Sequence, residues 1–245
     1  MPRYLLSPHS YACETGGYGV FLDLKHDKYT AVTSEDLRTL RTAVEGWTAS
    51  PTAITQPVEH APESVSPPSQ EEDVIQTLLK EGLLTADASN GKPATQPLLQ
   101  EPTTSLWEFP RPWPQFGRRD LRNFFSAWAA TTLRLRALPI RYVVNRLREG
   151  DLHQRRQSAS FEINKARVLT TIHFALQPLF YSAKDACLRN SLTLVEFLAK
   201  YEIYPTCVFG VKMDPFAAHA WVQHGAVVLT DPIEHVKTFT PIMLV

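Results

Sequence analysis

The segment 86–105 constrains the fold most, because it has no hydrophobic periodicity and contains Pro93, Pro97 and Pro102. Proline lacks a backbone N–H donor and has a fixed φ angle, so this spacing excludes a long helix or a central strand. A chain interrupted in this way is expected to fold as two modules. We therefore predict three parts, which are a first domain (1–86), a linker (87–106) and a second domain (107–245).

Charge is distributed unevenly between these modules. Residues 1–86 carry 6 Lys/Arg and 12 Asp/Glu, whereas residues 111–156 carry 11 Arg and 3 acidic residues. The chain as a whole has no net charge. An acidic first module argues against nucleic-acid binding, because phosphate contacts require clustered cations.

The cysteines and the apolar runs indicate the compartment. Three cysteines, an odd number in a chain of 245 residues, do not suggest a disulfide framework. No apolar run approaches the ~18 residues of a membrane span, and no basic start precedes an apolar segment. We therefore expect a cytoplasmic protein without a membrane span.

Residues 19–32 predict a β-hairpin in the first domain. Leu22 and Leu24 belong to an alternating apolar pattern, and Tyr29 resumes the pattern after a turn. We expect the segment Tyr4–Leu6 to add a third strand at the edge of this hairpin.

Two helices are expected to pack on the hairpin. Ser34 is the predicted N-cap of the first, and Gly82 is the predicted C-cap of the second, which follows apolar residues at helical spacing over 74–79. Residues 48–70 are rich in Pro, Ser and Thr and are predicted to form a flexible insertion. Together these elements indicate a small winged-helix-like unit.

The second domain is predicted to combine helices with strands. Residues 107–117 are expected to be extended. The predicted helices are 118–150, interrupted at Pro139, then 161–181, ending near Pro178, and one that starts after Asp185. The predicted strands lie near 206–212, 217–223 and 226–230.

Cys187 is the candidate nucleophile. If Asp185 is the N-cap, Cys187 lies in the first helical turn, where the helix dipole lowers the pKa of a thiol and free N–H groups can receive an oxyanion. Ser182 is an alternative N-cap that would place Cys187 one turn further inside the helix. The structural alternative is a buried core cysteine, which is also the expectation for Cys13 and Cys207.

His219 follows Cys187 by 32 residues, and Asp231 follows His219 by 12. In this order they can act as nucleophile, general base and the group that orients the base. The structural alternatives are a histidine held by the backbone and a polar cap on a strand. Because side chains alternate along a strand, Asp231 shares a face with His219 only if the turn near Gly225 has three residues or contains a bulge.

Metal binding is an alternative role for five side chains in this part of the chain. The candidate ligands are His219, His224, His235, Cys207 and Asp231. Their spacing resembles no zinc motif, and the chain has no glycine-rich nucleotide-binding motif. We therefore predict no metal and no cofactor.

The region from about 110 to the end resembles the transglutaminase-like B protein of lasso peptide biosynthesis, which is a leader peptidase. Five matching segments carry the resemblance: Cys187-Leu188-Arg189-Asn190-Ser191-Leu192, Gly210-Val211, Pro215-Phe216, His219-Ala220-Trp221-Val222 and Asp231. The chain departs from the family pattern at Gln223, where Glu is usual, and at Tyr204-Pro205, where a Gly is commoner.

The resemblance implies an α+β protein in which a winged-helix-like, PqqD-like leader-recognition module precedes a transglutaminase/papain-like cysteine peptidase domain. The leader of a precursor peptide would bind the first module as an added strand, and a lasso cyclase of asparagine-synthetase type would be a partner. The side chains expected to bind the leader are Leu22, Leu24, Tyr29, Val32 and Leu78. An acyl transferase of transglutaminase type and a non-catalytic leader-binding scaffold remain alternatives.

Overall fold

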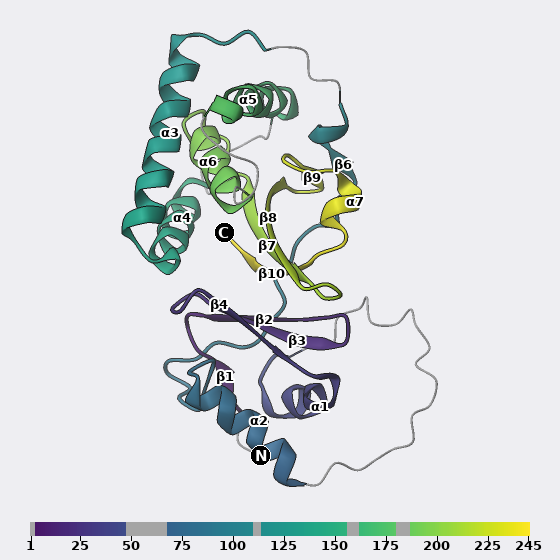
Figure 1. The fold of residues 1–245 in the computed structure, drawn as a ribbon. Coiled ribbons are helices and arrows are strands. Elements are labelled where there is room, and N and C mark those ends of the chain that lie inside the picture. The colour runs from purple at the N-terminus through teal and green to yellow at the C-terminus, as the bar shows by residue number, and fades with distance from the viewer. Residues whose placement is uncertain (1–2, 48–67, 110–113, 156–161, 180–186) are drawn as a thin grey trace. The chain divides into compact units, whose positions relative to one another are not determined.

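The computed structural model describes residues 3–47, 68–109, 114–155, 162–179 and 187–245. They form two compact units (Figure 1). The first unit contains the chain up to Pro97 together with Val211–Ala217 and Thr240–Met243, and the second contains the remainder. The first boundary, at Pro97, falls inside the segment that was predicted to be a linker.

The first unit contains a three-stranded antiparallel sheet. Its strands are β2 (Ser10–Thr15), β3 (Tyr18–Asp23) and β4 (Lys28–Val32), in the order β2-β3-β4. The predicted hairpin is confirmed as β3 and β4. β2 joins β3 through Gly16 and Gly17, whose φ angles of 56° and 79° suit the two-residue turns that link antiparallel strands. The Gly-Gly pair was therefore a hairpin signal that the sequence analysis missed.

The strand predicted at Tyr4–Leu6 does not join this sheet. Its last two residues form β1 (Leu5–Leu6), which pairs with β5 (Leu84–Thr85), while Tyr4 forms an isolated bridge with Val44. The prediction was wrong because β2 already occupies that edge of β3.

Two helices complete the first unit, α1 (Ser34–Ala43) and α2 (Pro68–Lys80). Ser34 is the first helical residue rather than the N-cap, and Thr33 precedes it in an extended conformation. Gly82 has the predicted C-cap geometry, with a φ of 74°, and the N–H of Leu83 bonds to the carbonyl of Leu78 at 2.9 Å. Most of the predicted insertion at 48–70 lies outside the described residues, and its last three residues begin α2.

Four helices dominate the second unit: α3 (Arg118–Ala137), α4 (Ile140–Arg155), α5 (Ile163–Leu176) and α6 (Cys187–Ala199). Short 3-10 turns lie at Leu106–Glu108 and Gln177–Leu179. The break predicted at Pro139 is confirmed, because α3 ends at Ala137 and α4 starts at Ile140. Within the described ranges, no helix has the length and apolar character that crossing a membrane requires.

A five-stranded sheet accompanies these helices in the order β10-β7-β8-β9-β6. The strands are β6 (Thr104–Ser105), β7 (Thr206–Lys212), β8 (Ala217–His224), β9 (Val227–Val228) and β10 (Thr240–Leu244), and α7 (Ile233–Val236) lies between the last two. β6 pairs in parallel with β9, so the end of the predicted linker is part of this sheet. β9 is shorter than the predicted strand 226–230.

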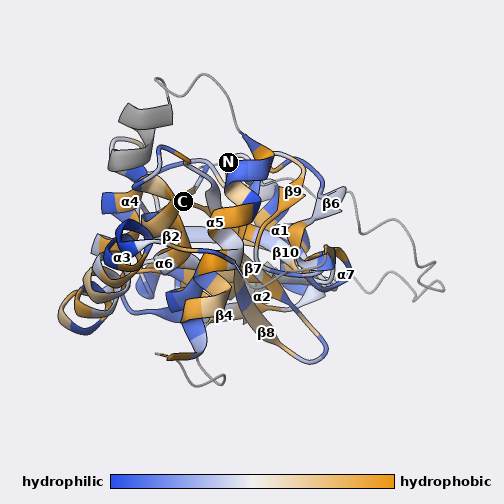
Figure 2. Ribbon diagram, turned by 90° about the horizontal axis from the view of Figure 1, so that it is seen from above, coloured by the Kyte–Doolittle hydropathy of each residue, from blue (hydrophilic) through white to orange (hydrophobic). Residues whose placement is uncertain are grey.

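Helices α3, α5 and α6 gather on one side of β7 and β8 (Figure 1). α3 shows hydrophilic and hydrophobic residues side by side in Figure 2, as expected for an amphipathic helix. Its buried face includes Phe124 and Ala127, which share a core with Phe197 of α6 and Val222 of β8. This packing determines where α6, and therefore its first residue, lies relative to the sheet.

Polar contacts reinforce the packing of α3 against α6. Arg134 of α3 forms an ion pair with Glu196 of α6. The hydroxyl of Tyr201, just beyond α6, donates a hydrogen bond of 2.5 Å to the carboxylate of Asp120 near the start of α3. These contacts tie both ends of α3 to the helix that presents Cys187.

Candidate active site

Cys187 is the first residue of α6, and its free thiol is exposed. The two predicted N-caps, Asp185 and Ser182, lie outside the described residues. Cys13 and Cys207 are free as well, but burial raises the pKa of each thiol to about 12. A buried thiol with such a pKa is not a nucleophile near neutral pH, so Cys187 remains the candidate nucleophile.

The surroundings of Cys187 favour its thiolate. A side-chain hydrogen bond with His219 makes the largest contribution and lowers the thiol pKa, against a smaller opposing effect of burial. Backbone hydrogen bonds from Ala220 and Leu188 lower the pKa further. The pKa of Cys187 therefore lies below the ordinary value of 9.0.

His219 lies on β8 and bridges Cys187 to Asp231. Its Nε2 atom is 2.9 Å from Oδ1 of Asp231. Burial lowers the pKa of the ring, but hydrogen bonds with Asp231 and Cys187 outweigh this effect and raise the pKa of His219 to about 9. A lowered thiol pKa beside a raised imidazole pKa favours a thiolate–imidazolium pair. Because Nε2 faces Asp231, the other ring nitrogen, Nδ1, is left to face the thiol.

The contact between His219 and Asp231 does not depend on a three-residue turn, which was one of the two predicted routes. His224 pairs with Val227 and Gln223 with Val228, so the turn contains only Gly225 and Ala226. Of the two routes that parity allowed, a three-residue turn or a bulge, the three-residue turn is therefore excluded. A regular continuation of this register would place Asp231 on the face opposite His219.

The chain instead leaves the ladder after Val228. The N–H of Leu229 still bonds to the carbonyl of Val222 at 2.8 Å, but the N–H of Val222 donates to Oγ1 of Thr230 at 3.0 Å. A side-chain oxygen has thus taken the place of a backbone carbonyl. The bend over residues 229–231 turns the Asp231 carboxylate toward His219.

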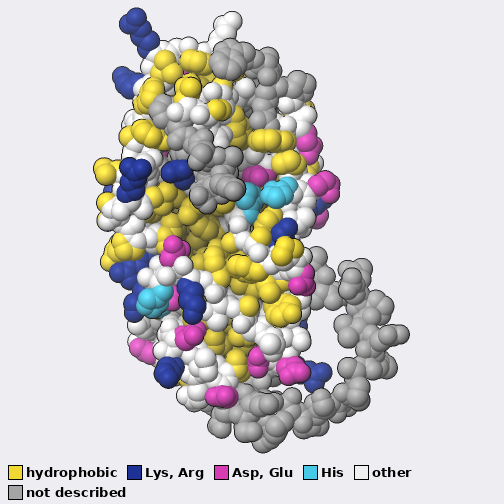
Figure 3. Space-filling view, in the orientation of Figure 1, with side chains coloured by type: hydrophobic (Ala, Val, Ile, Leu, Met, Phe, Trp, Pro, Cys, Tyr) yellow, Lys and Arg dark blue, Asp and Glu magenta, His cyan; other side chains and the backbone are white. Residues whose placement is uncertain are grey.

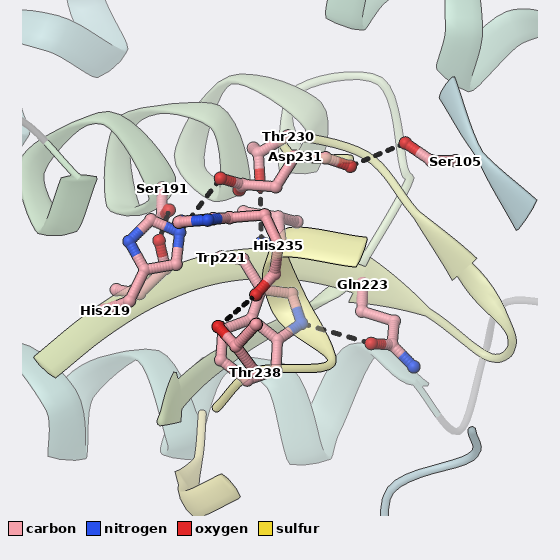
Figure 4. Close-up of polar contacts among 11 residues, drawn as sticks. Ser105, Ser191, His219, Trp221, Gln223, Thr230, Asp231, His235 and Thr238 are labelled. Carbon is pink, nitrogen blue, oxygen red and sulfur yellow. Dashed lines mark hydrogen bonds and ion pairs between the residues drawn. The ribbon is translucent and has the colours of Figure 1, made fainter. Parts of the chain in front are cut away.

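Two hydroxyl groups hold Asp231 in this position (Figure 4). Thr230 Oγ1 donates to Oδ2 of Asp231 at 2.5 Å, and Ser105 Oγ donates to the Asp231 backbone carbonyl at 2.6 Å. Ser105 lies 126 residues away in β6. Neither hydroxyl was predicted, because nothing in the local sequence distinguishes them from other Ser and Thr residues.

Gln223 supports the strand that carries His219. It is fully buried, and its Oε1 accepts a hydrogen bond of 3.1 Å from the indole of Trp221. Its Nε2 donates to the carbonyls of Gln100 at 2.6 Å and Gly225 at 2.7 Å. An amide is required here, because two of the three partners are acceptors. The glutamine at this position therefore has a structural reason in this chain.

The sequence analysis gave His235 no catalytic role. It lies on α7, and its ring centroid is 4.9 Å from that of His219, in an edge-to-face arrangement. Phe239 packs against both rings, at 5.2 Å and 5.3 Å. Figure 4 shows His235 beside His219 and Asp231. No spacing rule in the sequence predicts this proximity, because it arises from the position of α7 beside His219 in the fold.

The five residues predicted to bind a leader lie in the first unit. The side chains of Leu22, Leu24, Val32 and Leu78 are buried, and Tyr29 is partly buried. Tyr29 and Val32 belong to β4, which is an edge strand of the three-stranded sheet. A peptide added at this edge would contact the backbone of β4 rather than these buried side chains.

Comparison with known proteins identifies the region that contains the site. The sequence of residues 127–244 matches the family model of the transglutaminase-like superfamily. This stretch includes Cys187, His219 and Asp231. Searches of curated proteins and of solved structures found no match. The three residues of the candidate site therefore lie in a stretch similar to the transglutaminase-like superfamily, a similarity compatible with a cysteine peptidase or an acyltransferase.

Proposed function

We propose that this protein is a cysteine endopeptidase that removes the leader from a ribosomally made lasso precursor peptide. The observation that carries the proposal is the hydrogen-bonded series Cys187–His219–Asp231 inside the transglutaminase-like domain. An exposed cysteine of lowered pKa, a histidine of raised pKa and an orienting carboxylate have the properties that nucleophilic catalysis requires.

The proposed reaction starts from the thiolate–imidazolium pair. The Cys187 sulfur attacks the carbonyl carbon at the leader–core junction and forms a tetrahedral oxyanion. His219 then gives its Nδ1 proton to the amine of the core as the peptide bond breaks, which leaves the leader as a thioester on Cys187. Water attacks the thioester while His219 accepts one of its protons, and the leader leaves as a carboxylic acid. The backbone N–H of Cys187 is the proposed oxyanion donor.

The first unit supports a recognition role in this proposal. It combines a three-stranded sheet with two helices, as expected of a winged-helix-like, PqqD-like module, and β4 is an edge strand. An extended leader would add to this edge through backbone hydrogen bonds. Binding there would raise the effective concentration of the scissile bond at the active site. The proposed partner that receives the released core is an asparagine-synthetase-like lasso cyclase in the cytoplasm.

The test uses a peptide encoded by a short reading frame next to the gene. Incubation with the full-length protein should yield two fragments whose summed mass exceeds that of the peptide by one water. Cys187→Ala should abolish cleavage but retain binding of the fluorescently labelled peptide, and Cys13→Ala should retain cleavage. Continued cleavage by Cys187→Ala would show that another nucleophile is used.

The same assay separates peptidase from acyl transferase. With a primary amine such as methylamine present, a peptidase releases mainly the free acid, whereas an acyl transferase releases mainly the amide.

Variants of His219 and Asp231 should lose cleavage activity to different degrees. His219→Ala should be nearly inactive because no base remains, while Asp231→Asn should be impaired less, because the thiol pKa is already low. Equal losses in both variants would argue against an orienting role for Asp231.

A further inference from the structure

Two residues of the proposed catalytic series, His219 and Asp231, form a second arrangement with His235, which the proposed peptidase reaction does not use. Ligand atoms of His219, Asp231 and His235 all lie within 4.8 Å of one another. The three residues come from β8, from the bend after β9 and from α7. We propose that they bind one Zn²⁺ ion and that the bound ion reversibly blocks turnover. The second half of this inference rests on the proposed function, whereas the first does not.

The geometry of the cluster is close to that of a zinc site. Tetrahedral Zn²⁺ with bonds of about 2.1 Å places its ligand atoms about 3.4 Å apart. Nε2 of His219 and Oδ1 of Asp231 are already 2.9 Å apart, so these two side chains need to separate only slightly. His235 is exposed and can rotate to close the remaining gap. A water molecule would complete the four ligands.

The donor atoms favour zinc over Mg²⁺ and Ca²⁺. Two imidazoles and one carboxylate suit Zn²⁺, whereas Mg²⁺ and Ca²⁺ prefer oxygen ligands alone. The nearest lysine in sequence, Lys237, has its ammonium group 3.7 Å from the carboxylate of Glu101, which reduces its repulsion of a cation.

The site is open to ions from solvent. In Figure 3, histidine side chains (cyan) reach the surface close to acidic side chains (magenta), near the position of α7 in Figure 1. His219 and Asp231 are only partly buried. An ion can therefore reach the cluster without unfolding of the second unit.

Zinc binding would stop the peptidase by replacing a proton. The ion takes the Nε2 lone pair of His219 and Oδ1 of Asp231, and the proton that they shared leaves to solvent. His219 then keeps only its Nδ1 proton, and a metal-bound neutral imidazole is a far weaker acid than an imidazolium. The amine of the core could no longer be protonated as the peptide bond breaks.

Cys187 would not be a ligand of this ion, because the thiol faces Nδ1, on the other side of the ring. The remaining Nδ1 proton can still stabilise the thiolate. Zinc should therefore suppress cleavage but leave Cys187 open to alkylation. Zinc bound directly to the thiolate would suppress both.

Isothermal titration of ZnCl₂ into the full-length protein tests the site without using activity. We expect one ion per chain in the wild type and in Cys187→Ala. His235→Ala should weaken binding by about tenfold or more, as loss of a metal ligand requires. His224→Ala is the matched control and should bind zinc like the wild type, since His224 lies outside the cluster. Absence of binding, or binding lost in Cys187→Ala and kept in His235→Ala, would overturn the proposal.

The inhibitory half is tested by iodoacetamide labelling and peptide cleavage with and without saturating zinc. Labelling of Cys187 should persist while cleavage falls, and a chelator should restore cleavage. Zinc bound at the cluster with cleavage unchanged would overturn inhibition alone. Absence of cleavage in zinc-free protein would contradict the peptidase proposal. If zinc affinity still falls in His235→Ala, the metal site remains supported in that case.

Discussion

The hydroxyl of Ser191 donates a hydrogen bond of 2.9 Å to the carbonyl oxygen of Ala220. Ser191 lies one turn after Cys187 on α6, and Ala220 follows His219 on β8. The bond is buried, so water does not compete for it. It links the helix of the candidate nucleophile directly to the strand of the candidate base.

Ser191→Ala should therefore weaken both stability and the contact between Cys187 and His219. We expect the free energy of unfolding to fall by about 1 kcal/mol, because a buried carbonyl loses its partner. We also expect slower alkylation of Cys187 at neutral pH, since its thiolate would be less well stabilised. Urea denaturation and iodoacetamide kinetics measure the two effects. Ser126→Ala, on the exposed face of α3, is the control and should change neither. Unchanged alkylation in Ser191→Ala would remove Ser191 from any positioning role.

The pH dependence of the site follows from two shifts of opposite direction. The pKa of Cys187 is lowered, so its thiolate is lost only when the pH falls through a value below 9.0. The pKa of His219 is raised to about 9, so the imidazolium is lost when the pH rises through that value. Peptide cleavage should be maximal between these two values, and its alkaline limb should have a midpoint near 9.

Alkylation kinetics of the full-length protein check the acid limb directly. The rate of iodoacetamide labelling should rise with pH at a midpoint below 9.0 in the wild type. In His219→Ala this midpoint should move up toward 9.0, because the largest stabilising contact of the thiolate is gone. Identical midpoints in the two proteins would mean that His219 does not activate Cys187.

Gln223→Glu should destabilise the protein even though the two side chains have nearly the same shape. A carboxylate cannot donate to the carbonyls of Gln100 and Gly225, and it would be a buried charge. We expect a loss of about 2 kcal/mol or more at neutral pH, measured by urea denaturation. The loss should shrink at acidic pH, where a protonated Glu can donate one bond. Gln115→Glu is an exposed control, and a similar loss there would indicate a general effect of charge.

His173→Phe should make the protein less sensitive to acid. His173 is fully buried among Phe124, Phe174 and Phe197, and burial lowers its pKa from 6.5 to about 3. Below pH 6.5 the unfolded chain binds a proton that the folded chain does not bind, so the stability of the wild type falls as the pH drops toward 3.

The stability difference between His173→Phe and the wild type should therefore grow by about 2 kcal/mol as the pH falls from about 7.5 to about 5. Urea denaturation at the two pH values measures this change. Any packing cost of the larger ring is the same at both values and cancels. A difference that does not vary with pH would show that His173 finds a proton partner in the folded state.

Local features of this chain were predictable from its sequence because their causes are local. Pro139 interrupts a helix through its own ring and missing donor, and Gly82 ends one because it adopts a positive φ without steric cost. The strand-forming residues of Tyr18–Asp23 and Lys28–Val32 were visible within each segment. The order Cys187, His219, Asp231 likewise indicated a chemistry without any coordinates.

Relationships that depend on hydrogen bonds between distant segments were decided only by the tertiary structure. Parity required a three-residue turn or a bulge near Gly225 and could not decide between them, because the ladder is broken by the hydroxyl of Thr230, which competes for the N–H of Val222. Ser105 joins the site from a segment that resembles a linker in sequence, and His235 reaches it because α7 lies beside His219 in the fold. Register and long-range contacts are set by the packing of the whole domain, so the sequence determined which groups are present, and the fold determined which of them meet.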